Sequence, residues 1–86
     1  MEPSMKITEI KPYAVIERFP EHEETIKQLF KNEYNFKLLC SDYRRCFKAL
    51  EFWSKSDLSE ARQRKEEYKS LLAELEMEVF ANLNNR

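Results

Sequence analysis

Apolar residues recur at helical spacing along two long stretches of this chain of 86 residues. In the first stretch they step by three and four without a break, which is the spacing of a single helical face. Only Glu33 and the terminal Ser54 are polar on that face. The pattern predicts one helix over residues 20–54. Its face runs through Ile26, Leu29, Glu33, Phe36, Cys40, Tyr43, Phe47, Leu50 and Ser54.

A second helical stretch follows the polar segment SKSD, which interrupts the first pattern. Asp57, followed by Glu60, has the spacing of an N-cap residue and its capping-box partner. The pattern therefore predicts a second helix over residues 57–83. Leu71, Phe80 and Leu83 widen its apolar face. The face itself runs through Leu58, Ala61, Lys65, Tyr68, Leu72, Leu75, Val79 and Asn82.

Two long helices joined by a short connection fold back antiparallel. We therefore predict an all-α fold, a coiled-coil-like antiparallel two-helix hairpin spanning residues 19–86, with its turn near Ser54–Ser56. The open end then carries both Phe19–Ile26 and Val79–Leu83. Glycine is absent from the chain, which argues against a β fold with many turns.

The N-terminal residues 1–18 are expected to form an arm, extended or partly disordered, because β-branched runs lie on both sides of Pro12. The segment FPEHEE that follows contains the only histidine, His22, among three glutamates. Pro20 suits the first helical position, and the glutamates suit the positive end of the helix dipole. We interpret FPEHEE as a helix start with a solvent-facing histidine.

The apolar stripe of the first helix is three rows wide, broader than a two-helix seam requires. Such a stripe needs a third element, and a large uncovered apolar patch marks an association site. We prefer self-association of hairpins into a helical bundle; the alternatives are a cover formed by residues 5–16 and a different protein partner. The candidate interface residues are Phe36, Leu39, Tyr43, Cys46, Leu50 and Trp53.

The chain has 15 Lys and Arg and 16 Asp and Glu, so its net charge of −1 is close to zero. Only the distribution of the charges along the chain is informative. Residues 17–33 and 74–86 are acidic on balance, whereas residues 37–69 carry nine bases against six acids. Hairpins could therefore pair with an acidic end against a basic half. Nucleic-acid binding is the less favoured alternative, because acids lie among the bases. The candidate basic patch is Arg44, Arg45, Lys48, Arg62, Arg64 and Lys65.

Candidate chemistry is sparse, and we expect a non-enzyme with no catalytic residue, cofactor or metal. Cys40 and Cys46 are too far apart along one helix for a disulfide, so they are predicted to be buried thiols. A metal or redox switch built on them and His22 is the least favoured class. Runs of glutamate in the second helix are interpreted as a solvated face: Glu66, Glu67, Glu74, Glu76 and Glu78.

No apolar run approaches the roughly 20 residues of a membrane span, and no signal peptide is evident. A cytoplasmic location is therefore expected.

From Phe19 to Leu83 the chain resembles the YdcH-like family of small bacterial proteins of uncharacterised function. The residues that carry the resemblance are Phe19-Pro20-Glu21-His22, then Phe36, Leu39 and Tyr43, and finally Glu78-Val79-Phe80 with Leu83. The resemblance implies a helical hairpin and supplies no functional residue. The arm and the aromatic pair Phe52-Trp53 depart from the family pattern.

Overall fold

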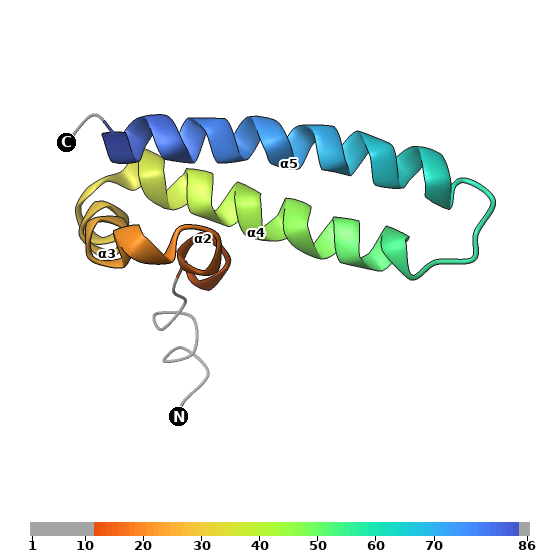
Figure 1. Ribbon diagram of the computed structural model, residues 1–86, viewed down its shortest axis with the longest axis horizontal. Coiled ribbons are helices and arrows are strands. Elements are labelled where there is room, and N and C mark those ends of the chain that lie inside the picture. The colour runs from red at the N-terminus through yellow and green to blue at the C-terminus, as the bar shows by residue number, and fades with distance from the viewer. Residues whose placement is uncertain (1–11, 85–86) are drawn as a thin grey trace, which may run out of the picture.

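Residues 12–84 are described by a computed structural model, and every regular element among them is helical (Figure 1). The order is α2 (Tyr13–Arg18), the 3₁₀ turn η1 (Pro20–His22), α3 (Glu23–Asn32), α4 (Tyr34–Ser54) and α5 (Ala61–Asn84). The two long helices, α4 and α5, lie side by side and antiparallel. The predicted all-α class and antiparallel hairpin are therefore confirmed.

The connection between α4 and α5 is longer than predicted, because α5 begins at Ala61 rather than at residue 57. Ser56, not Asp57, organises this turn: its hydroxyl oxygen accepts a hydrogen bond from the backbone N–H of Leu58 at 3.1 Å. The N–H of Ala61 then donates to the carbonyl of Leu58 at 3.0 Å. A serine side chain bonded two residues ahead favours a turn over a helix start, which explains why the predicted cap at Asp57 is wrong.

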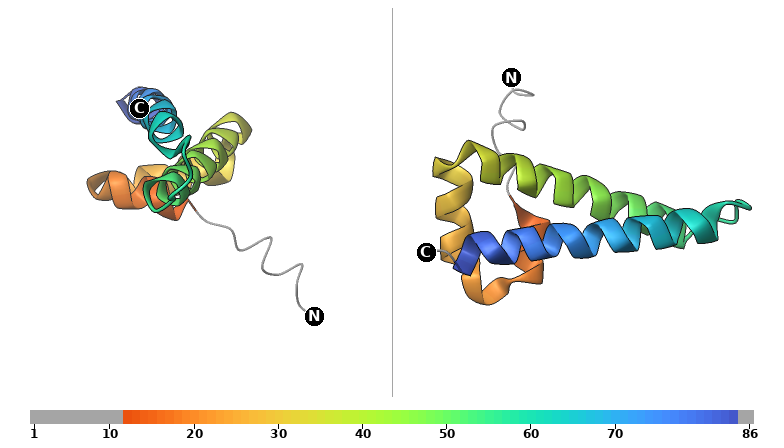
Figure 2. Two further views of the ribbon diagram at one scale, coloured as in Figure 1. Left: turned by 90° about the vertical axis from the view of Figure 1, so that its right-hand side faces the viewer. Right: turned by 90° about the horizontal axis from the view of Figure 1, so that it is seen from above.

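The predicted continuous helix over residues 20–54 is also wrong, because the chain breaks at Glu33. Glu33 is extended, with φ −119° and ψ 110°, and its N–H donates to the carbonyl of Leu29 at 2.8 Å. The break turns α3 across the open end of the hairpin, as the second view in Figure 2 shows. This turn buries Ile26 and Leu29 in the same core as α4 and α5. Burial of those side chains outweighs the helical continuity that the apolar spacing alone predicted.

The described part of the predicted arm is helical rather than extended. Residues 13–18 form α2, and the N–H of Ile16 donates to the carbonyl of Pro12 at 2.9 Å. The low helix propensity of its β-branched residues is overridden by packing, since Val15 is only 1% exposed. Residues 1–11 lie outside the described part of the chain, and so does most of the predicted cover formed by residues 5–16.

α4 is the central helix of the fold. One buried cluster joins α2, α3, α4 and α5 at the open end of the hairpin. α5 covers one side of α4, and α2 with α3 covers another (Figures 1 and 2). The buried members of this cluster are Val15, Phe19, Ile26, Leu29, Phe36, Leu39, Cys40, Tyr43, Val79 and Leu83.

We expect Val15→Ala to lower the free energy of unfolding by about 1.5 to 3 kcal/mol, because it leaves a cavity between α2 and the core. Tyr13→Ala, on the same helix but at a position 63% exposed, is the matched control and should change stability by less than about 0.5 kcal/mol. Urea denaturation followed by circular dichroism measures both. Equal, small effects of the two substitutions would contradict the docking of α2.

Candidate functional site

Four of the six candidate interface residues face the interior of the chain. Phe36, Leu39, Tyr43 and Cys46 are all buried within the single chain. Leu50 and Trp53, also on α4, are half-buried. Phe36, Leu39 and Tyr43 belong to the buried cluster, where α2 and α3 supply the third element that the wide stripe required. Cys46 lies outside that cluster, against Tyr68 of α5.

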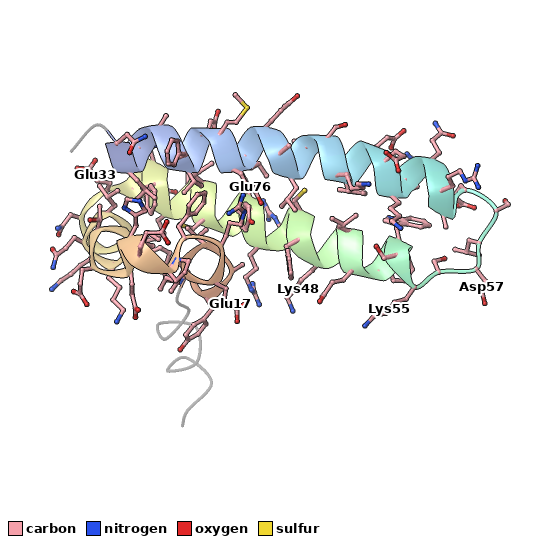
Figure 3. The ribbon with its side chains drawn as sticks, viewed as in Figure 1. Glu17, Glu33, Lys48, Lys55, Asp57 and Glu76 are labelled. Atoms are coloured by element: carbon pink, nitrogen blue, oxygen red, sulfur yellow. The ribbon has the colours of Figure 1, made fainter. Side chains whose placement is uncertain are left out.

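Tyr43 also anchors a polar contact among three helices. Its hydroxyl donates to Oε2 of Glu76 on α5 at 2.9 Å. The same carboxylate oxygen lies 3.0 Å from Nε of Arg18 at the end of α2. In Figure 3, Glu76 points from α5 toward the other two helices. Burial and the hydrogen bond to Glu76 raise the pKa of Tyr43, so the phenol stays protonated as the donor.

Both cysteines are buried free thiols, as predicted. Burial raises the pKa of Cys40 to about 12 and raises that of Cys46 as well. The Cys46 thiol donates to the backbone carbonyl of Tyr68 at 3.4 Å. Because the thiolate is the reactive form, these environments favour a packing role for both residues.

The histidine of FPEHEE lies in η1, with Pro20 at the first position, as expected of a helix start. His22 is half-buried rather than fully solvent-facing. Preceding it, Phe19 stacks on Phe80 of α5 with ring centroids 6.2 Å apart, so this segment closes the open end. Within residues 12–84, no group of three His, Cys, Asp or Glu side chains gathers as metal ligands would.

The half of the hairpin nearest the turn has a thinner core than the open end. We call residues 46–71 the stalk; it contains none of the residues of the buried cluster. Several apolar side chains are exposed there: Phe47 (38%), Phe52 (58%), Leu58 (54%) and Leu71 (44%). Phe52 packs edge-on against Trp53, with ring centroids 4.9 Å apart. Exposed apolar surface of this kind is typical of an interaction site.

A groove runs along the seam between α4 and α5 where the stalk meets the open end. This seam groove has a volume of about 300 Å³. Its apolar residues are Cys46, Ala49, Leu71 and Leu75, with the ring of Tyr68 beside them. The remaining lining residues, Asp42 and Arg45, form an ion pair at 3.0 Å. The groove thus combines an apolar floor with a charged margin.

The six candidate basic residues do not act as one uncompensated cluster. Arg45 and Arg64 are each paired with an acid three residues away on the same helix, at 3.0 Å. Arg44 and Lys48 lie on α4, whereas Arg62 and Lys65 lie on α5. In Figure 3, Lys48 points away from α5. The arrangement gives little support to a phosphate-binding surface.

The sequence signal was weak for Leu71, which lines the seam groove, and misleading for Glu76, which contacts Tyr43 and Arg18. Leu71 widened the apolar face of the second helix, which was the available hint of the seam groove. Glu76 was interpreted as part of a solvated acidic face, and that interpretation is wrong, because it bonds Tyr43 and Arg18. Its position among four other glutamates hid the fact that it points inward.

No family model, curated protein or solved structure matches this chain. Among the described residues, no helix is long and apolar enough to cross a membrane.

We expect Tyr43→Phe to lower the free energy of unfolding by about 1 to 2 kcal/mol, because it removes a partly buried hydrogen bond to a carboxylate. Tyr34→Phe, at a position 71% exposed, is the matched control and should be nearly neutral. Thermal and urea unfolding measure the difference. A neutral Tyr43→Phe would show that the contact with Glu76 contributes nothing to stability.

Stability should fall at alkaline pH, because the folded state favours neutral Cys40 and Tyr43. The pKa values of these groups in the unfolded chain, 9.0 and 10.0, lie below those in the folded chain. Keeping both groups neutral therefore costs the folded chain nothing below about pH 9, and the folded chain loses stability as pH rises above that value. We expect a loss of roughly 2 kcal/mol between pH 9 and 11. Cys40→Ala should flatten this dependence in urea titrations at stepped pH. An unchanged slope would contradict the role of the thiol.

Proposed function

We propose that the protein is a non-catalytic association module that binds a second protein chain through its stalk. The observation that carries this proposal is the exposed apolar surface of the stalk beside the seam groove. At the open end, the chain covers the equivalent surface of α4 with its own α2 and α3. The stalk has no such cover among the described residues, and a helix from another chain would supply it.

A second copy of the chain is the partner that we favour. Two hairpins that pack groove to groove about a twofold axis form a four-helix arrangement with a closed, self-complementary interface. In the antiparallel orientation, the acidic open end of one copy lies beside the basic half of the other. Residues 17–33 carry five acids against three bases, and residues 37–69 carry nine bases against six acids. This complementarity supports self-association over an unrelated partner.

Nucleic-acid binding receives no comparable support, because Arg45 and Arg64 are already paired with acids. The resemblance to the YdcH-like family remains a prediction. It agrees with a hairpin and names no partner. The proposal therefore depends on the stalk alone.

We expect Leu71→Glu to reduce self-association at least tenfold, because it places a charge in the floor of the seam groove. Met77→Glu is the matched control: it lies on the same helix, is 72% exposed and does not line the groove. Light scattering across a concentration series measures the solution mass, and circular dichroism confirms that each variant is helical.

A wild-type chain that is monomeric at every concentration would overturn self-association. An equal effect of the two substitutions would show that the seam groove is not the interface. Leu71 suits this test because it is 44% exposed, so the substitution leaves the core intact. Leu39→Glu would be a poor test, since that side chain is buried and its replacement would unfold the chain.

A further inference from the structure

A second depression lies where α2, α3 and the first turn of α4 meet. It has a volume of about 610 Å³, within the range of roughly 300 to 1,000 Å³ usual for small-molecule sites. Pro12, Ile16 and Phe30 provide apolar lining, with Tyr13 beside them. This depression is separate from the seam groove, and no residue lines both.

Three lysines surround this apolar lining, together with a single acid. Lys27 pairs with Glu23 at 3.0 Å, so its charge is compensated. Lys31 and Lys37 also line the depression, and neither is within ion-pair distance of a carboxylate in the described part of the chain. Two uncompensated positive charges therefore adjoin an apolar surface.

Lys37 is held in place by an aromatic contact. Its Nζ lies 5.4 Å from the centroid of the Phe30 ring, a cation–π geometry. Phe30 comes from α3 and Lys37 from α4, so the break at Glu33 creates this arrangement. The ammonium of this exposed lysine thus lies over the Phe30 ring, next to the apolar lining. A ligand that places an anionic group there can accept a charge-assisted hydrogen bond from Lys37.

We propose that this depression binds a small amphipathic carboxylate, with an aromatic or alkyl body on Pro12, Ile16 and Phe30 and its carboxylate at Lys31 and Lys37. An uncharged aromatic or alkyl ligand would leave the ammonium groups of Lys31 and Lys37 unpaired. A small anion without an apolar part would leave the apolar lining uncovered. The site therefore selects for both halves in one molecule. None of the residues that line it belongs to the stalk.

The test is a titration of the full chain with 2-naphthoate, followed by ¹H–¹⁵N correlation spectra. We expect saturable shifts at residues lining the depression and a Kd of about 0.1 to 1 mM, as its size and accessibility allow. 2-Naphthamide keeps the body without the charge, and acetate keeps the charge without the body; both should bind at least about fivefold more weakly. Decanoate tests an alkyl body in place of an aromatic one, and it should give the same pattern of shifts.

Lys31→Gln and Lys37→Gln should each weaken naphthoate binding by about three- to fivefold, the effect of an exposed ion contact. Lys48→Gln, on the same helix as Lys37 but outside the depression, is the matched control and should bind like the wild type. The spectra also show whether each variant is folded. Equal binding of naphthoate and naphthamide, no saturable shifts, or shifts confined to the seam groove would overturn the proposal.

Discussion

The packing of α4 against two partners at once is the constraint on which the rest of the structure depends. Its apolar side chains extend around more of the helix than α5 can cover, so Phe36, Cys40 and Tyr43 require a second covering element. α2 and α3 meet that requirement at the open end, where they complete a single buried cluster. The Tyr43–Glu76–Arg18 contact ties α4, α5 and α2 together beside this cluster. Because α2 and α3 are short, they cover α4 only at the open end. In the stalk, α4 packs against α5 without a third helix among the described residues.

This division of the hairpin links the fold to both proposals. The break at Glu33 lets α3 cross the open end, which buries Ile26 and Leu29 and also brings Phe30 next to Lys37. The same short covering helices leave Phe47, Phe52 and Leu71 exposed farther along the hairpin. Both candidate surfaces are therefore consequences of how far the N-terminal helices reach. They lie on different parts of the molecule and are separable by substitution.

The apolar spacing was enough to predict the helical class, the antiparallel pairing and the end of α4 at Ser54. Glu33 and Ser54, the only polar positions on the first face, both lie at helix boundaries in the structure. The spacing of apolar residues did not predict the break at Glu33. An extended conformation with negative φ is open to any residue, so neither a glycine nor a proline marks the break in the sequence. The helicity of α2 depends on the burial of Val15, a tertiary effect absent from local sequence. For the same reason, four predicted interface residues proved to be internal: their spacing showed that they needed a cover but not which segment provides it.

The most direct test of the division into a packed open end and an uncovered stalk is amide hydrogen exchange at a series of protein concentrations. Opening free energies follow local packing, so at low concentration the amides of residues 46–54 and 61–71 should exchange faster than those of residues 36–43 and 76–83. As concentration rises and hairpins associate, we expect protection to increase most in the stalk and along the seam groove. Uniform protection along α4 and α5, unchanged with concentration, would contradict both the division of the hairpin and the proposed role of the stalk.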